Sequence, residues 1–238
     1  MAIKSQLSAS TAFPEQRRKI GPGKPPGRRI FIRKRNGLEI ELHGEERAPP
    51  HFSAFETTSG VTMEFYSTKL GDAYLVQLEP ARDNRGFFAR TFCAEEFAAR
   101  GLETNFPQHS FSFSARRGTL RGMHYQRDPC SEAKLVRCTQ GAILDVIIDI
   151  RPNSPTYRRW QEFELSRVNG HQLYIPKGFA HGFQTLSNDV EVNYLISAPY
   201  RPEAAHGIRY NDPAFGISWP LLVTEISEKD LHWPDFSE

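Results

Sequence analysis

Short runs in which apolar and polar residues alternate, separated by turn-forming residues, fill the chain from Met63 onward. Apolar side chains at every second position are typical of β-strands that bury one face. The pattern predicts strands over Glu64–Tyr66, Ala73–Leu78, Phe87–Phe92, Ser110–Ser114, Lys134–Cys138, Ala142–Ile150, Arg159–Leu165, Gln172–Pro176 and Glu191–Ser197. Many short strands joined by turns predict an all-β sandwich or barrel.

Two connections and one helix interrupt these strands. Asp83–Gly86 predicts a turn, and Thr139–Gly141 predicts a hairpin connection between the strands on either side of it. Ala94–Arg100 is the one stretch here that predicts a short helix, and Gly101 follows it at the position where glycine commonly ends helices.

The first 62 residues lack the alternating pattern. Gly21–Gly27 and Ala48–Pro50 are rich in glycine and proline, which interrupt helices and strands, so we expect this extension to be largely disordered. Arg28–Leu42 alternates weakly and predicts a hairpin or a strand. Because Met63 directly precedes the first convincing strand, we expect one domain over residues 63–238, with Met63 as a candidate translation start.

The net charge of +2 is unevenly distributed. Residues 1–62 hold eleven Lys or Arg against six Asp or Glu, a net charge of +5, which leaves −3 for residues 63–238. A basic segment suits nucleic acid or another anionic surface, but this one lacks the interleaved aromatic residues on which bases stack. We therefore expect a solvated tail and no nucleic-acid partner.

Three further absences favour a cytoplasmic protein with no membrane partner. No apolar run approaches the roughly 18 residues of a membrane span. No charged and then apolar signal peptide opens the chain. The three cysteines lack the paired spacing of a disulfide framework or a zinc site.

Arg116–Gln126 concentrates the candidate chemistry of the chain. Its two glycines allow a turn or a close approach of the backbone to a ligand. Arg121 offers a planar donor for a carboxylate or phosphate, and His124 exchanges protons near neutral pH. The segment predicts a site, and the competing interpretation of His124 is a hydrogen-bonded structural histidine.

Six motifs follow one another between Met63 and about Pro234: Arg85–Phe88, Leu120–Gln126, Lys134–Arg137, Ile175–Phe183, Tyr210–Pro213 and Ile226–Asp230. In order and spacing they resemble the dTDP-4-dehydrorhamnose 3,5-epimerase family. Gly170–His181 also resembles the second cupin motif, whereas the single His124 stands where metal-holding cupins have His-x-His. The resemblance implies a cupin-type double-stranded β-helix, or jelly roll, with a few short helices. It also implies an isomerase that uses no metal and no cofactor.

The family's activity implies epimerisation at C3, C5 or both of a nucleotide-linked 4-keto-6-deoxyhexose, of the dTDP-4-dehydro-6-deoxyglucose to dTDP-4-dehydrorhamnose type. This reaction belongs to deoxysugar, rhamnose or cell-surface polysaccharide biosynthesis. It requires removing a proton beside the ketone, holding an enolate and returning a proton from the other face. The resemblance gives His124 as the base, Asp230 as its partner, Tyr194 as the acid and Lys134 as the cation near O4. It implies that the substrate-binding residues are Arg85, Gln108, Ser110, Arg121, His181, Tyr200 and Lys229.

Each assignment has a structural alternative. A tyrosine such as Tyr194 in an apolar strand is ordinarily a core residue. His181 is also suited to closing a turn, and Asp230 to a surface helix whose Ser-x-x-Asp pattern predicts an N-terminal cap. Phe87 and Phe88 suit a core as well as they suit a nucleotide platform.

Three departures from the family leave the nucleotide base, the sugar and the number of inverted centres open. Arg90 stands where the family commonly has an acidic residue, Ser110 where it has Asn, and Ala205 near a Glu position. Losing a matched polar contact changes selectivity strongly.

The family also implies a homodimer. Two other classes of protein stay open, a metal-dependent cupin enzyme and a catalytically silent sugar-binding cupin. The missing His-x-His argues against the first, and the joint presence of His124, Lys134, Tyr194 and Asp230 argues against the second.

Overall fold

The computed structural model describes residues 34–35, 38–39 and 62–237, in two units with bounds Met1–Glu56 and Thr57–Glu238. In the first unit, β1 (Lys34–Arg35) pairs antiparallel with β2 (Leu38–Glu39), inside the stretch that predicted a hairpin. The other expectations for residues 1–61 lie outside the described part of the chain.

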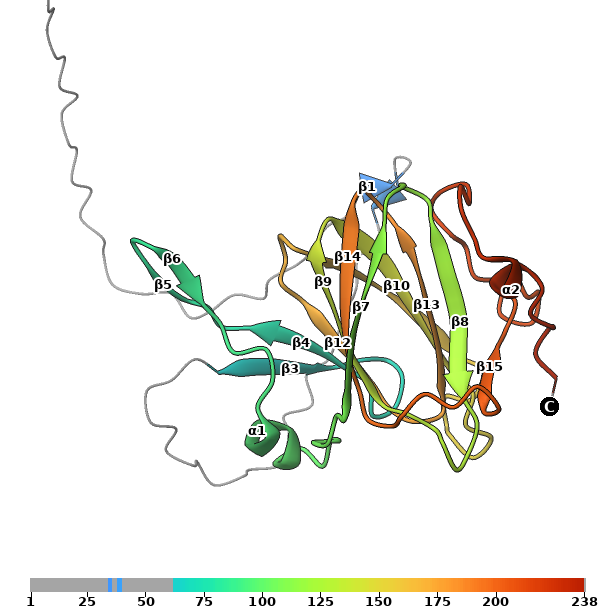
Figure 1. The fold of residues 1–238 in the computed structure, drawn as a ribbon, viewed down its shortest axis with the longest axis horizontal. Helices are drawn as coiled ribbons and strands as arrows, with labels where there is room; N and C mark the ends of the chain where they lie inside the picture. The colour runs from blue at the N-terminus through green and yellow to red at the C-terminus, as the bar shows by residue number, and fades with distance from the viewer. Residues whose placement is uncertain (1–33, 36–37, 40–61, 238) are drawn as a thin grey trace, which may run out of the picture. The chain divides into compact units, whose positions relative to one another are not determined.

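Two large antiparallel sheets form the body of the second unit (Figure 1). The six-stranded sheet has the order β3-β4-β12-β9-β14-β7, with bounds β3 (Met63–Ser67), β4 (Tyr74–Leu78), β7 (Gln108–Ser114), β9 (Lys134–Gln140), β12 (Gln172–Ile175) and β14 (Val190–Ile196). The five-stranded sheet has the order β11-β10-β13-β8-β15, with bounds β8 (Leu120–Gln126), β10 (Ala142–Asp149), β11 (Trp160–Ser166), β13 (Phe179–Thr185) and β15 (Ala205–Gly207). From β8 to β14 the chain crosses repeatedly between the sheets, so the expected all-β jelly roll is confirmed.

The smaller elements lie outside the two sheets. β5 (Ala81–Asp83) and β6 (Gly86–Phe88) form a hairpin at the predicted turn, and it extends away from the sheets in Figure 1. The strand predicted to run to Phe92 ends at Phe88, because Phe88 pairs with Ala81, the first residue of β5. The predicted helix is α1 (Ala94–Ala98), and α2 (Glu228–Leu231) lies beside β8. Within residues 62–237, helices of five and four residues are too short to span a membrane.

The predicted hairpin at Thr139–Gly141 is wrong. β9 pairs with β12 and β14, whereas β10 pairs with β11 and β13, so Gly141 carries the chain from one sheet to the other. Its φ of +73° favours glycine, and a Cβ there would lie 2.5 Å from Ser187 Oγ. A glycine turn suits a hairpin and a crossing between sheets equally well. β10 has buried residues on both faces and lies between β11 and β13.

Apolar side chains from both sheets meet in the main core. Its members include Val136, Val192, Ile143, Ile147 and Phe183. A second cluster packs α1 against the six-stranded sheet, and a third covers the five-stranded sheet.

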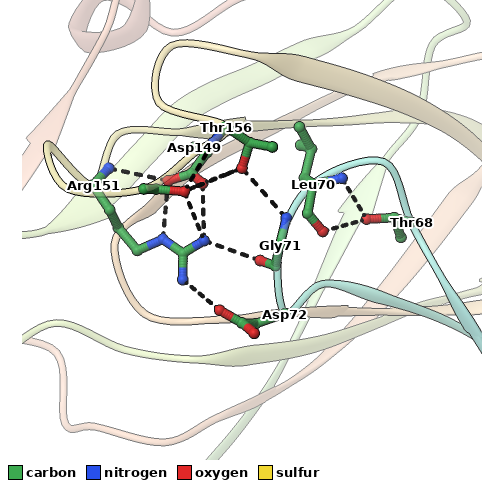
Figure 2. A network of polar contacts seen from close by, with 8 residues as sticks. Thr68, Leu70, Gly71, Asp72, Asp149, Arg151 and Thr156 are labelled. Atoms are coloured by element: carbon green, nitrogen blue, oxygen red, sulfur yellow. Dashed lines mark hydrogen bonds and ion pairs between the residues drawn. The ribbon is translucent and has the colours of Figure 1, made fainter.

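A polar network ties the turn after β3 to the loop after β10 (Figure 2). The fully buried Asp149 accepts hydrogen bonds from Arg151 Nη2 at 2.8 Å and Thr156 Oγ1 at 2.6 Å. Arg151 also donates to Asp72 at 2.9 Å and to the carbonyl of Gly71 at 3.0 Å. Burial alone would raise the pKa of Asp149, but these donors hold it below its usual value.

Candidate active site

A cavity of about 590 Å³ is lined by β8, β15, the start of β9, the end of β14 with its following loop, and the segment around α2. It gathers seven of the eleven predicted site residues, which are Gln108, Arg121, His124, Lys134, Tyr200, Lys229 and Asp230. The other four do not line it, namely Arg85, Ser110, His181 and Tyr194.

His124 and Asp230 form a hydrogen-bonded pair in the cavity wall. The predicted cap at α2 is present, since Ser227 Oγ accepts from the Asp230 N–H at 3.0 Å. The cap holds Asp230 Oδ1 2.6 Å from His124 Nε2, while Oδ2 accepts from the Gly122 N–H at 3.1 Å. Trp233 Nε1 also donates to Oδ1, at 3.2 Å. Asp230 is buried, so the interpretation as a surface helix residue is wrong.

This arrangement suits His124 to accept a proton. Burial alone would raise the pKa of Asp230, but the hydrogen bond and charge of His124, with the N–H groups of Gly122 and Trp233, hold that pKa below its usual value. The carboxylate therefore stays ionised and stabilises a positive charge on the imidazole. With 45% of its side chain exposed, His124 is accessible from the cavity.

His181 lies beside His124, in register on the neighbouring strand β13. The two strands approach closely at Gly122, whose φ is +127° and where a Cβ would lie 2.5 Å from the Gly182 Cα. His181 Nε2 bonds Asp145 Oδ2 at 2.9 Å, and both side chains are buried. Burial raises the pKa of Asp145, although the charge of His181 opposes this shift. His181 is therefore buried beside His124 and does not line the cavity, and its contact with the substrate stays a prediction.

Tyr194 lies on β14, in the sheet opposite that of His124. Its hydroxyl is 2.9 Å from Ser112 Oγ, and its ring centroid is 6.5 Å from that of His181. Burial raises the pKa of Tyr194 well above its usual value, so the phenol keeps its proton at neutral pH. Ser110 is in register with Tyr194 on β7 and is exposed.

Lys134 begins β9 and lies in the cavity wall, with 13% of its side chain exposed. Its Nζ is 3.0 Å from Oε1 of Glu132, which lines the same cavity. The cation expected near O4 is thus paired with an acidic residue that sequence reasoning missed.

Four predicted binding residues make contacts within the chain at the cavity. Arg121 donates to the carbonyl of Phe113 at 2.9 Å. Gln108 Oε1 accepts from the Tyr200 N–H at 2.7 Å, which joins β7 to the loop after β14. Lys229, also predicted, lies with its ammonium group 5.0 Å from the Trp233 ring.

Arg85 lies apart from these residues, in the turn of the β5–β6 hairpin. Its side chain is 90% exposed and pairs with Asp83 at 2.5 Å. This ion pair raises the pKa of Arg85 and lowers that of Asp83.

Comparison with known proteins decides the family. The family model described as dTDP-4-dehydrorhamnose 3,5-epimerase matches residues 67–238. The chain belongs to this family. A relative from Sinorhizobium fredii, named dTDP-4-dehydrorhamnose 3,5-epimerase, is 42% identical to this chain over 177 residues. The matched part is 74% of this chain and 91% of the relative.

Two solved structures of other epimerases closely resemble this chain. The dTDP-4-dehydrorhamnose 3,5-epimerase from Bacillus anthracis, with TDP and PPi bound, has a TM-score of 0.72 at 38% identity and covers 74% of this chain and 100% of that one. The dTDP-6-deoxy-D-glucose-3,5-epimerase from Legionella pneumophila, in complex with dTDP-4-keto-L-rhamnose, has a TM-score of 0.69 at 37% identity and covers 73% of this chain and 93% of that one. The predicted isomerase class and the family-level epimerase activity are confirmed, while the residue roles stay predictions.

Sequence reasoning missed several residues of the epimerase's cavity wall. They include Tyr125, Glu132, His206 and Trp233. Glu132 had a signal, because it stands two positions before Lys134 in an alternating stretch. Tyr125 also had a signal, because it follows His124 in the segment that predicts a site, whereas His206 and Trp233 lie outside that segment. Across residues 62–237, no three His, Cys, Asp or Glu side chains gather as they would around a metal ion.

Proposed function

We propose that this epimerase inverts C3, C5 or both carbons of a nucleotide-linked 4-keto-6-deoxyhexose through an enolate, with His124 as the base. The observation that carries the proposal is the 2.6 Å bond between His124 and Asp230 in the cavity wall. When His124 takes the proton beside the ketone, the ionised carboxylate stabilises the imidazolium that forms.

Lys134 stabilises the enolate in this mechanism. Removing the proton leaves negative charge on O4, and a fixed cation at that point lowers the barrier. Support comes from the position of Lys134 in the same cavity wall as His124. The steps need only a base, an acid and a cation, so the mechanism uses neither a metal nor a cofactor.

Tyr194 returns the proton from the other face of the sugar. Two observations support this role: β14 and β8 belong to opposite sheets, and the raised pKa keeps the phenol protonated. Ile196, two residues further along β14, lines the cavity. The sugar therefore has to reach past Ile196 into the gap between the sheets.

The substrate carries a thymidine diphosphate in this proposal. The TDP and dTDP-4-keto-L-rhamnose bound to the two solved relatives support it. Arg121 and Lys229 supply cationic donors at the cavity, which suit phosphate oxygens. The remaining proposed substrate contacts are Arg85, Gln108, Ser110, His181 and Tyr200.

We assign this activity to a domain over residues 63–238 that works as a homodimer in the cytoplasm, in deoxysugar or rhamnose biosynthesis. Phenylalanines exposed on β7 and on the β5–β6 hairpin support self-association.

Proton exchange tests the proposed function. The purified protein is incubated with dTDP-4-keto-6-deoxyglucose in deuterated water, and NMR follows deuterium at C3 and C5. We expect exchange at one or both carbons, a loss of about 10²- to 10⁴-fold in His124→Ala, and no change in His232→Ala. His232 is an exposed histidine outside the cavity wall and is the matched control.

Exchange at both carbons identifies a 3,5-epimerase, and exchange at one carbon identifies a single-site epimerase. Folded wild-type protein that binds the nucleotide sugar without exchanging either proton would overturn the proposal in favour of a silent sugar-binding cupin.

A further inference from the structure

Glu132 is a carboxylate of the cavity wall with one unused oxygen. Only 6% of its side chain is exposed, and Oε1 pairs with Lys134. Oε2 is buried and has no hydrogen-bond partner among residues 62–237. Burying a carboxylate oxygen without a donor costs free energy, so a donor on a bound molecule would complete this site.

The other two carboxylates of the cavity wall are already engaged. Asp230 accepts hydrogen bonds from His124 and Gly122. Glu225 accepts from Arg116 Nη1 at 2.6 Å and is partly exposed to solvent. Among the described lining residues, Glu132 is therefore the carboxylate that keeps a buried oxygen for a ligand.

We infer that Glu132 determines substrate specificity by accepting a hydrogen bond from the hydroxyl on C3 of the sugar. This inference rests on the proposed function, which puts the Lys134 ammonium group at the ketone oxygen O4. Because Glu132 is 3.0 Å from that ammonium group, it lies beside a substituent next to the ketone.

The chemistry of the substrate identifies that substituent. C4 has two neighbouring carbons. C5 carries a hydrogen, a methyl group and the ring oxygen, none of which donates a hydrogen bond, whereas C3 carries a hydroxyl. The C3 hydroxyl is therefore the donor that fits Oε2, and it also orients the carbon whose proton His124 removes.

A cycle of two sugars and two proteins tests the inference. The sugars are dTDP-4-keto-6-deoxyglucose and its 3-deoxy analogue. The readout is kcat/KM for deuterium exchange at the carbon that the wild type exchanges, C5 where it exchanges both, because each sugar keeps a proton at C3 and at C5. We expect the wild type to discriminate against the 3-deoxy sugar by about 10- to 100-fold, the effect of a hydrogen bond to a charged acceptor. In Glu132→Ala, kcat/KM for the hydroxylated sugar should fall by about the same 10- to 100-fold. The variant should then favour the hydroxylated sugar over the 3-deoxy sugar by less than about 2-fold.

Glu132→Gln keeps a neutral acceptor and should show intermediate discrimination, which keeps the test decisive if Glu132→Ala does not fold. An equal loss on both sugars, or no loss, would overturn the inference, because Glu132 would then only position Lys134 or be dispensable. A wild type that exchanges neither the C3 nor the C5 proton of the hydroxylated sugar would overturn the proposed function itself, and this inference with it.

Discussion

At the scale of single residues, Asp230 contributes stability that depends on pH. Its pKa in the folded protein lies below its usual value because the donors around it outweigh burial. Such a carboxylate adds stability above its unfolded pKa of about 3.9, and this stability is lost as the pH falls through the lower folded value. We predict that Asp230→Asn lowers the free energy of unfolding by about 1–3 kcal/mol at neutral pH.

Urea unfolding of wild type and Asp230→Asn measures this difference. The gap between the two proteins should be constant from neutral pH to about pH 5 and should narrow below about pH 4. An equal difference in the free energy of unfolding at neutral pH and below about pH 4 would contradict the prediction.

A substitution at Tyr194 distinguishes the removal of the sugar proton from the inversion of the carbon. We predict that Tyr194→Phe still exchanges the sugar proton with solvent, because His124 removes and returns it on one face, while inversion falls by about 10²- to 10⁴-fold. Because burial raises its pKa, Tyr194 should not limit the wild-type rate up to about pH 10.

NMR in deuterated water measures exchange and inversion in the same sample. Ser112→Ala is the matched control, since it removes the hydrogen-bond partner of Tyr194 and keeps the phenol, and it should cost less than about 10-fold. If Tyr194→Phe reduces exchange and inversion by the same factor, Tyr194 is not the acid on the second face.

At the scale of elements, alternation predicts where strands lie but not which strands pair. The alternation of apolar and polar residues correctly predicts the positions of four strands, which are β4, β7, β11 and β14. The corner at Gly141 was predicted as a hairpin, because the choice between one sheet and two depends on partners far along the chain. β15 was missed, because three residues hold too little alternation to detect.

The network around Arg151 joins elements that are distant in sequence (Figure 2). Arg151→Ala leaves the fully buried Asp149 without its cation. Breaking a fully buried ion pair costs about 3–5 kcal/mol, and because 27% of the Arg151 side chain is exposed we predict about 2–4 kcal/mol. At roughly 2–4 °C per kcal/mol, the Tm should fall by about 4–16 °C.

Thermal unfolding followed by circular dichroism checks this value. Arg167→Ala, which removes an exposed arginine, is the control and should change the Tm by less than about 2 °C. Epimerase activity at 25 °C should persist in Arg151→Ala, since the network lies outside the cavity wall. A Tm equal to that of the control would show that the network adds no stability.

At the scale of the whole molecule, motifs that are distant in sequence meet in one cavity. His124, Lys134 and Asp230 come from three separate motifs, and the resemblance of these motifs to the family predicted that the three residues belong to one site. The partner of Lys134 was not predicted, because burial of Glu132 depends on how the loop before β9 packs. Arg85 was predicted at the same site, yet it lies on an exposed hairpin outside the cavity wall.

Exposed phenylalanines predict that two copies associate. Phe111 and Phe113 point outward from the edge strand β7 with 70% and 48% exposed, and Phe87 and Phe88 on the β5–β6 hairpin are 64% and 67% exposed. An edge strand with apolar side chains is a template for pairing, because its backbone groups and its apolar surface are both unsatisfied. We predict that the protein sediments at about twice its chain mass of 27.2 kDa.

Replacing both Phe111 and Phe113 by Ser should shift the protein toward the mass of one chain, because it removes the apolar surface that association would bury. Leu222→Ser is the matched control: it removes an apolar side chain that is 90% exposed and lies outside β7 and the β5–β6 hairpin, so the dimer should persist. Sedimentation velocity at micromolar concentration distinguishes the two masses. Wild-type protein that sediments at the mass of one chain would contradict the predicted dimer. A double variant that still sediments as a dimer would show that the interface does not depend on the phenylalanines of β7.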